Sequence, residues 1–207
     1  MKLRGLYPII DVGVIEAGRA LRVAEEIIQA GVKIFQLRAK SLPSGEFLEL
    51  ASEMARLAGK ADVNFIVNDR TDIAFLAQAD GVHLGRDDLP LAAARKILGR
   101  EKIIGLSSHS PAEALEAQAQ GADYVAFGPI FPTSTKPDAQ KPKGIEALRE
   151  IKAKIRLPLV AIGGIREELA PQVIEAGADM LAVIADLLNA PDVGEKAKRF
   201  GVLFKEN

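Results

Sequence analysis

The 207-residue sequence contains no cysteine. This absence excludes disulfide bonds, catalysis by a thiolate, and zinc or iron–sulfur centres with cysteine ligands. It also fits a reducing compartment. The chemistry of the protein must therefore rest on other side chains.

A strong excess of one charge is also missing, since the formal net charge is −1. This balance gives no reason to expect a nucleic acid or an anionic membrane as partner, so any phosphate recognition must come from a local site. No run approaches the ~18 uncharged apolar residues of a bilayer span, and residues 1–10 hold too few apolar residues for a signal peptide. We expect a soluble, cytoplasmic protein.

Short apolar runs alternate with longer segments of helical period. The runs are rich in β-branched residues and mostly apolar on both faces, which is typical of parallel strands covered by helices. Within residues 17–30, Leu21, Ala24 and Ile28 fall on one helical stripe. Eight strand–helix units predict an α/β fold, a single-domain (β/α)8 TIM barrel over residues 1–207. The expected strands are residues 6–11, 34–40, 64–69, 81–85, 103–108, 124–130, 158–164 and 180–185.

A weak internal repeat supports the barrel. Similar phrases at residues 29–32, 119–123 and 175–179 place Gly31, Gly121 and Gly177 where a helix hands over to the next strand. A glycine there can end the helix in a left-handed conformation with little strain. Evenly repeated units are what a barrel needs, whereas a doubly wound open sheet needs no such evenness.

Polar residues gather at the carboxyl ends of the expected strands, where barrel enzymes carry their active sites. Gln36, Arg38 and Lys40 alternate along the second strand, so we expect all three side chains to point into the barrel. Two cations there are costly unless an anion neutralises them, which favours an anionic ligand. The alternative is a structural network in which they pair with Asp69 or other carboxylates.

Asp69 and Asp88 are carboxylates at the ends of two strands, beside this cationic position. A few hard oxygen ligands suit Mg²⁺, which keeps several waters and shares substrate phosphates. The pair therefore predicts a magnesium site. For Asp88 alone the alternative is a helix N-cap, because Leu89 and Pro90 lead into a helical segment.

The last two expected strands predict a phosphate site. Gly163 and Gly164 would let backbone N–H groups approach a ligand, and the segment after Ile184 and Ala185 can offer a helix N-terminus. A tight turn is the alternative explanation for the two glycines. Residues 132–143 form the one long loop, with three prolines, and we expect it to act as a mobile segment or a lid.

His83 and His109 are the only histidines, so any imidazole acid–base role falls to them. His83 lies inside an apolar run and is interpreted as a core residue with satisfied hydrogen bonds. His109 begins a loop, where it either lines the site or caps the next helix. No Ser–His–Asp arrangement is evident, so nucleophilic catalysis is not indicated.

Seven segments together resemble the thiamine phosphate synthase family, in order from the second expected strand to the eighth. The sixth-strand segment is the most specific of them. The segments are QLRAK (residues 36–40), NDR (68–70), ADGVHLG (79–85) with Asp88, GLSSH (105–109), GADYVAFGPIFPTSTK (121–136), VAIGGI (160–165) and GADMLAVIA (177–185).

The resemblance implies a Mg²⁺-dependent transferase acting on small phosphorylated substrates. A pyrimidine diphosphate loses pyrophosphate, and a thiazole nitrogen attacks the resulting methylene cation. Asp69 and Asp88 would hold the metal, and Arg38, Lys40 and Lys136 would be catalytic by stabilising the departing pyrophosphate. The pyrimidine diphosphate would be held by Gln36, Leu37, Arg38, Ala39, Lys40, Asn68, Ser107 and Lys136, and the thiazole phosphate by Thr133, Ser134, Thr135, Gly164, Ile184 and Ala185.

Two positions depart from the family pattern. Arg86 stands where glutamine is common, and Ala185 stands where serine is common. Losing a hydroxyl contact at residue 185 would cost about 0.5–1.5 kcal/mol, which weakens thiazole phosphate binding without abolishing it.

Three other functions compete with this one. A thiazole tautomerase of the same superfamily would use His109 as acid and base and need no metal. A sugar-phosphate isomerase or epimerase would share the phosphate site, and a non-catalytic ligand-binding barrel would need no chemistry. The combination of cations and carboxylates favours the synthase over the tautomerase and the non-catalytic barrel, and the sixth-strand segment that ends in Lys136 gives the isomerase or epimerase no support.

Overall fold

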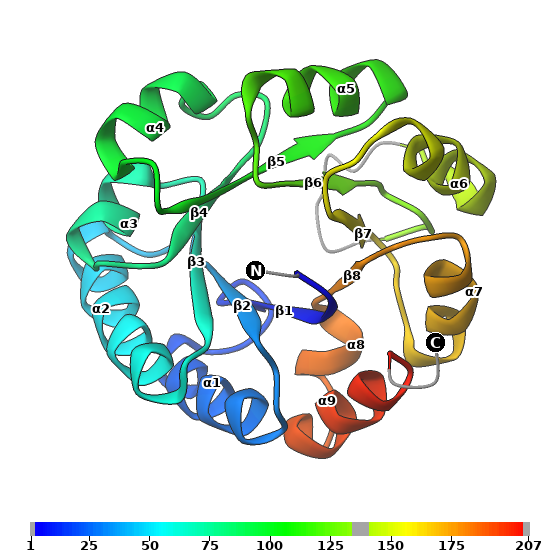
Figure 1. Cartoon of the computed structure of the whole chain (residues 1–207). Helices are drawn as coiled ribbons and strands as arrows, with labels where there is room; N and C mark the ends of the chain where they lie inside the picture. The colour runs from blue at the N-terminus through cyan, green and yellow to red at the C-terminus, as the bar shows by residue number, and fades with distance from the viewer. Residues whose placement is uncertain (1–2, 134–140, 205–207) are drawn as a thin grey trace.

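Eight parallel strands close into a barrel in the computed structural model of the protein, which describes residues 3–133 and 141–204. Each strand pairs with the next along the chain, and the eighth pairs with the first. Figure 1 shows the strands as an inner ring surrounded by helices, which confirms the predicted (β/α)8 barrel. The strands are β1 (Gly5–Asp11), β2 (Ile34–Arg38), β3 (Asn64–Asn68), β4 (Gly81–Leu84), β5 (Ile103–Ser108), β6 (Tyr124–Phe127), β7 (Leu159–Ile162) and β8 (Met180–Val183).

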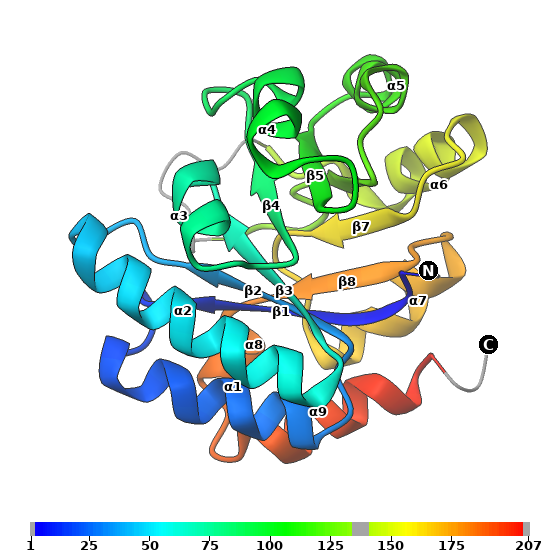
Figure 2. The same ribbon diagram turned by 60° about the vertical axis from the view of Figure 1, so that its left-hand side comes forward.

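Helices cover the outside of the barrel, as the side view in Figure 2 shows for α1 and α2. None of those in the described ranges combines the length and hydropathy of a membrane span. They are η1 (Ala17–Arg19), α1 (Ala20–Gln29), α2 (Ser44–Ala61), α3 (Thr71–Leu76), α4 (Leu91–Leu98), α5 (Pro111–Gln120), α6 (Gly144–Lys154), η2 (Glu167–Leu169), α7 (Ala170–Glu175), α8 (Ala185–Leu188) and α9 (Val193–Val202).

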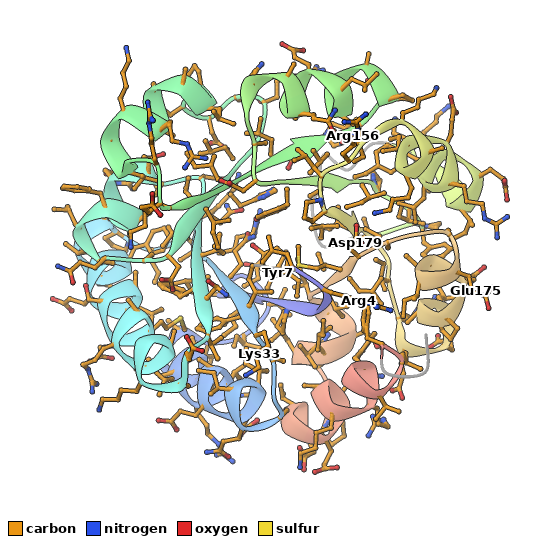
Figure 3. All side chains as sticks on the ribbon, viewed as in Figure 1. Arg4, Tyr7, Lys33, Arg156, Glu175 and Asp179 are labelled. Carbon is orange, nitrogen blue, oxygen red and sulfur yellow. The ribbon has the colours of Figure 1, made fainter. Side chains whose placement is uncertain are left out.

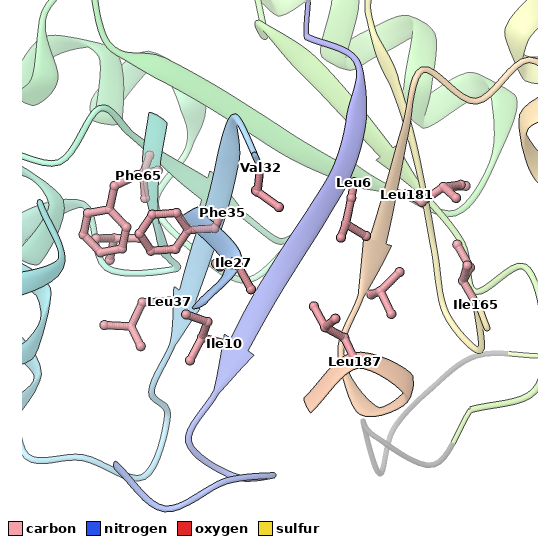
Figure 4. Close-up of a cluster of buried hydrophobic side chains, with 14 of the residues drawn as sticks. Leu6, Ile10, Ile27, Val32, Phe35, Leu37, Phe65, Ile165, Leu181 and Leu187 are labelled. Carbon is pink, nitrogen blue, oxygen red and sulfur yellow. The ribbon is translucent and has the colours of Figure 1, made fainter. Parts of the chain in front are cut away.

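The alternation of side chains along each strand creates two apolar layers. On β2, Ile34 packs inside the barrel, in a cluster that also holds Tyr7 and Tyr124. Phe35 belongs to the larger layer between strands and helices, part of which is drawn in Figure 4. Both layers exclude water from the strands, which explains why the strand sequences are apolar on both faces.

The three repeated glycines adopt the left-handed conformation that the sequence predicts, with φ of +89° at Gly31, +85° at Gly121 and +99° at Gly177. Two of the repeats also end in an aspartate, and a third aspartate, Asp80, precedes β4. Each carboxylate accepts a hydrogen bond from a backbone N–H of the preceding strand and so ties neighbouring strands together at their amino ends. The donors are Phe65 for Asp80 (2.8 Å), Ile104 for Asp123 (2.7 Å) and Leu159 for Asp179 (2.8 Å), and Figure 3 labels Asp179.

Several strands are shorter at their carboxyl ends than the sequence predicts. The strand expected over residues 34–40 ends at Arg38, and the one expected over 124–130 ends at Phe127. The residues beyond these ends leave the ladder and form the loops of the barrel mouth, so the polar groups there are carried by turns.

Candidate active site

One cavity of about 660 Å³ opens at the carboxyl ends of the strands. Its walls come from segments that follow or end every strand from β2 to β8. Lys40, Asp69 and Asp88 line it together with Gly164. The predicted convergence of distant polar residues on one rim is therefore confirmed for Lys40, Asp69 and Asp88. Ser134, Thr135 and Lys136 lie outside the described residues.

Lys40 lies at the rim of the cavity. Its Nζ is 3.0 Å from an Asp69 carboxylate oxygen, and its side chain is 60% exposed. Because β2 ends at Arg38, Lys40 sits in the following turn. The expectation that it continues the inward row of Gln36 and Arg38 is wrong, since the strand geometry that would turn it inward has already ended.

Arg38 is paired with Asp11, the last residue of β1. Arg38 Nη1 donates to Asp11 Oδ2 at 2.6 Å, and the Asp11 side chain is only 2% exposed. Within the described part of the chain, Arg38 is not among the residues that line the cavity, and its buried Nε has no hydrogen-bond partner. Both cations are thus neutralised by carboxylates, as the structural-network alternative proposes. The partner of Arg38, however, is a residue that the sequence argument did not single out.

Asp69 and Asp88 face each other at the mouth. Asp69 has φ +63°, a left-handed conformation that is rare outside glycine and that a non-glycine residue keeps only when its surroundings hold it. Asp88 Oδ2 accepts the Gly85 N–H at 2.7 Å. Asp88 is not a helix N-cap, because α4 begins after Pro90 and has no side-chain cap. The capping alternative is therefore excluded.

The pKa of Asp88 is raised above its ordinary value of 3.8. Burial is the largest cause; the Gly85 N–H opposes it, and the neighbouring Asp69 carboxylate raises the pKa further. Two carboxylates that disfavour each other's charge are a suitable place for a divalent cation. Among the residues that the structure describes, no group of three or more acidic, histidine or cysteine side chains is clustered for a metal.

His83 is buried and hydrogen-bonded, as predicted for a core residue, yet it also lines the cavity. Its Nδ1 lies 3.0 Å from the Tyr124 hydroxyl and its Nε2 lies 2.9 Å from Ser107 Oγ. Ser107 was predicted to bind substrate and does line the cavity. Tyr124 and, beyond it, Tyr7 were missed, although an aromatic residue with a polar tip at an inward strand position was a readable signal.

His109 lines the cavity, which settles one of the two roles left open for it. Its Nδ1 lies 2.7 Å from the Gly128 carbonyl oxygen. A carbonyl only accepts, so Nδ1 carries the proton, and in the neutral ring Nε2 is the acceptor. The helix cap is instead Ser110, whose Oγ accepts the Glu113 N–H.

The turn after β7 has no room for side chains at its two glycines. Gly163 has φ +95° and Gly164 has φ +64°. A Cβ on Gly164 would lie 2.4 Å from the Pro132 carbonyl oxygen, and one on Gly163 would lie 2.4 Å from Pro129 Cβ. The tight turn and the close backbone approach are thus both present, and both place this turn against the segment after β6. Thr133, in that segment, lines the cavity as well.

The remaining predicted site residues lie in three different places. Asn68, Ile184 and Ala185 line the cavity, and Ala185 is the first residue of α8. Leu37 and Ala39 instead bury their side chains in the layer under the helices. The remaining one, Gln36, is buried inside the barrel and donates to the Tyr7 hydroxyl at 2.8 Å.

Arg86, at the position that departs from the family pattern, lies at the rim of the cavity. Its Nη2 is 2.6 Å from Glu113 Oε1, and its side chain is 71% exposed. Glu113 also accepts the His109 backbone N–H at 2.7 Å. Arg86 thus braces the loop that carries His109. Two further cavity residues, Arg166 and Asp186, were not singled out from the sequence.

A closed barrel whose mouth gathers cations, facing carboxylates and a glycine turn defines a (β/α)8-barrel enzyme. The family model of thiamine monophosphate synthase matches residues 6–187. A thiamine-phosphate synthase from Shouchella clausii is 48% identical over 84% of this chain and 83% of its own length. One from Chloroflexus aurantiacus is 44% identical over 96% of this chain and 91% of its own.

A solved structure of thiamine phosphate pyrophosphorylase from Pyrococcus furiosus superposes with a TM-score of 0.90 at 36% identity, covering 99% of this chain and 97% of that one. The chain belongs to the thiamine monophosphate synthase family. It is a transferase of thiamine biosynthesis.

Proposed function

We propose that the protein condenses 4-amino-2-methyl-5-(diphosphooxymethyl)pyrimidine with a thiazole phosphate and releases pyrophosphate, in the cytoplasm and with Mg²⁺ as cofactor. The observation that carries the proposal is the shared cavity, in which Lys40, Asp69 and Asp88 stand together with the Gly163–Gly164 turn. A site for a diphosphate and a site for a monophosphate are what a two-substrate condensation of this kind needs.

We assign the diphosphate of the pyrimidine substrate to the wall of the cavity that is formed at the carboxyl ends of β2 to β5. Lys40 is exposed enough to exchange Asp69 for a phosphate, and Asn68 and Ser107 line the same wall. Arg38 would act from beneath this wall, because its charge is held there by Asp11. The proposed set for this substrate is Gln36, Leu37, Arg38, Ala39, Lys40, Asn68, Ser107 and Lys136.

Asp69 and Asp88 fit the proposed magnesium ion. Their mutual repulsion is relieved by a divalent cation, and two carboxylates leave room for the waters and phosphate oxygens that Mg²⁺ retains. When bound, the ion would supply positive charge against the phosphate oxygens. Lys40 already balances part of the carboxylate charge at 3.0 Å, so a phosphate that draws Lys40 away also frees Asp69.

The thiazole phosphate falls to the opposite loops. Backbone N–H groups of a glycine turn approach a phosphate more closely than any side chain allows. The proposed set is Thr133, Ser134, Thr135, Gly164, Ile184 and Ala185, of which the described members line the cavity. The loop of residues 132–143, expected from the sequence to act as a mobile segment or a lid, lies largely outside the described residues, which end at 133 and resume at 141.

The chain supplies no nucleophile and needs none, because the thiazole nitrogen attacks the methylene carbon. What the protein stabilises is the negative charge that the leaving pyrophosphate gains as its bond breaks. Charge-assisted hydrogen bonds contribute roughly 1.5–3 kcal/mol each, so Lys40 and Lys136 together would lower the barrier by about 3–6 kcal/mol. Arg38 would add only the longer-range effect of its charge, since Asp11 already takes its hydrogen bond.

The direct test supplies both substrates with Mg²⁺ and measures pyrophosphate and thiamine phosphate together. We expect the two products in equal amounts. The Lys136→Ala variant should keep its thermal midpoint and lose about 100-fold in turnover, as expected for loss of one transition-state donor. Absence of both products with the folded wild-type chain contradicts the proposal.

A thiazole tautomerase is the second candidate, because His109 lines the cavity with Nε2 as an acceptor. Such an enzyme would isomerise the thiazole without the pyrimidine substrate and without metal. Proton exchange at the thiazole ring in the presence of a chelator, abolished by His109→Gln, would support it. Equal yields of pyrophosphate and thiamine phosphate support the synthase.

A further inference from the structure

A chain of hydrogen bonds runs through the barrel interior to the cavity. It begins at the Gln36 amide, whose Nε2 donates to the Tyr7 hydroxyl at 2.8 Å. The Tyr7 hydroxyl lies 2.8 Å from that of Tyr124, which lies 3.0 Å from His83 Nδ1. His83 Nε2 lies 2.9 Å from Ser107 Oγ, and of these five residues only His83 and Ser107 line the cavity.

The direction of the chain follows from its first donor. The Tyr7 oxygen accepts from Gln36, so its own O–H needs an acceptor, and the Tyr124 oxygen is in range. Both tyrosines are almost fully buried, where an unpaired hydroxyl would cost about 1–3 kcal/mol. The Tyr124 O–H is then left to donate to His83 Nδ1, and every hydroxyl is satisfied.

Both tyrosines keep their protons under all ordinary conditions. Burial raises the pKa of Tyr7 and that of Tyr124 well above the ordinary value of 10. The two rings meet edge to face with centroids 5.8 Å apart, and the His83 ring is stacked on Tyr124 at 5.6 Å. The two tyrosines therefore take part in these hydrogen bonds as neutral hydroxyls.

The consequence appears at the cavity wall. His83 accepts at Nδ1, so its proton is on Nε2 and is donated to Ser107 Oγ. Ser107 accepts from the imidazole, which leaves its own O–H to donate to a ligand in the cavity that it lines. The arrangement gives the two histidines opposite tautomers, because His109 carries its proton on Nδ1.

We propose that Tyr7 and Tyr124 are positioning residues that act through His83 to present Ser107 as a hydrogen-bond donor. Ser107 then selects a ligand whose facing atom is an acceptor, such as an unprotonated ring nitrogen. This inference rests on the proposed function, in which Ser107 contacts the pyrimidine substrate.

The tautomers are measurable without any turnover. The chain has two histidines, so protein labelled with ¹⁵N in the imidazole rings gives two sets of ring signals, and the His109→Gln variant leaves only His83. We expect neutral His83 with its proton on Nε2. A proton on Nδ1 of His83 in the wild-type chain overturns the inference, and it does so without bearing on whether the protein is a synthase.

The Tyr124→Phe variant tests the functional half. It keeps the ring and removes the donor to Nδ1, so His83 should populate both tautomers, and Ser107 should lose part of its donor role. We expect KM for the pyrimidine diphosphate to rise about 10-fold while KM for the thiazole phosphate stays unchanged. Tyr7→Phe should raise KM for the pyrimidine diphosphate by a smaller factor, because Tyr124 can still donate to His83.

Phe35→Leu is the matched control, because Phe35 is buried in the apolar layer between strands and helices and takes no part in the hydrogen-bond network. It should lower stability without moving either KM. An altered tautomer with an unchanged pyrimidine KM in Tyr124→Phe overturns the selective role of Ser107, and equal changes in both KM values overturn it as well. If Tyr124→Phe does not fold, the wild-type tautomer and Tyr7→Phe decide.

Discussion

Lys40 Nζ lies 3.0 Å from an Asp69 carboxylate oxygen at the exposed rim of the cavity. Arg38, two residues earlier, is instead paired with Asp11, whose side chain is only 2% exposed. The two cations of one strand end thus have different surroundings. An exposed pair contributes about 0.2–1 kcal/mol. Breaking a buried pair costs about 3–5 kcal/mol, because the remaining charge is left uncompensated.

Arg38→Ala and Lys40→Ala should therefore separate stability from turnover. We expect Arg38→Ala to lower Tm by about 6–20 °C, and Lys40→Ala by less than ~4 °C, using ~2–4 °C per kcal/mol for a chain of this size. Both should lower kcat. Thermal unfolding followed by circular dichroism measures the first effect and a pyrophosphate assay the second. Equal Tm losses would contradict the assigned partners, and the double variant Asp11→Asn with Arg38→Met should regain most of the lost stability.

Asp69→Ala should change how activity depends on magnesium. Losing one of two carboxylate ligands should move the midpoint of a Mg²⁺ titration at least about 10-fold higher. Asp72→Ala is the control, since Asp72 pairs with Arg70 on the exposed start of α3. It should leave the titration unchanged. An unaltered midpoint in Asp69→Ala removes this residue from the metal site.

Asp88→Asn should affect stability with a sign set by the raised pKa of Asp88. The experiment uses wild-type protein freed of metal with a chelator. Protonated Asp88 contributes to the free energy of unfolding below the ordinary pKa of 3.8, and this contribution is lost as the pH rises through the higher pKa of the folded state. The variant keeps an acceptor for the Gly85 N–H and carries no charge. We expect it to unfold at a higher temperature than the wild type at pH 7, with a difference that shrinks toward pH 4.

The opposite slope is expected for Asp72→Asn. The hydrogen bond from Arg70 is the main cause that lowers the pKa of Asp72 below 3.8. The stability linked to that group is present above the ordinary pKa and is lost as the pH falls through the lowered one. This variant should therefore be less stable than the wild type at pH 7. If the difference in Tm between Asp88→Asn and the wild type does not change with pH, the charge of Asp88 does not destabilise the folded protein.

The fold was largely readable because the periodic apolar runs and helix-ending glycines are local features. The strand expected over residues 103–108 has the observed bounds. The carboxyl end of β1 at Asp11 was also expected. The other strands end earlier than expected, because the residues that build the mouth continue the strand-like pattern of the sequence after the ladder has ended. The glycines of the repeats were interpreted correctly, but the bonds of Asp123 and Asp179 to the preceding strands were not foreseen.

The site was readable in part for the same reason. Asp69 and Asp88 could be placed together from the barrel topology alone, since carboxyl ends of neighbouring strands share one face. The same argument could have placed Asp11 beside Arg38, since they are register partners at the ends of β1 and β2, but Asp11 was not singled out from the sequence. The link from Tyr7 to Tyr124 spans 117 residues and likewise depends on the closed barrel.

Gly164→Ala should reduce both stability and binding of the thiazole phosphate. The added Cβ would lie 2.4 Å from the Pro132 carbonyl oxygen at a residue with φ +64°, so the turn must move. Strain and overpacking of this kind cost about 1–3 kcal/mol, or a Tm loss of about 2–12 °C. KM for the thiazole phosphate should rise more than KM for the pyrimidine diphosphate, because in the proposed site the displaced N–H groups would contact only the former.

Gly59→Ala provides the matched control for this change. Gly59 lies within α2 (Ser44–Ala61), and a Cβ there meets nothing within 4 Å. Replacing a helical glycine by alanine at such a position stabilises by about 0.5–1 kcal/mol, so Tm should rise by about 1–4 °C with both KM values unchanged. If Gly164→Ala behaves like Gly59→Ala, the turn after β7 is not a phosphate site, and the monophosphate must be held by the other loops of the mouth.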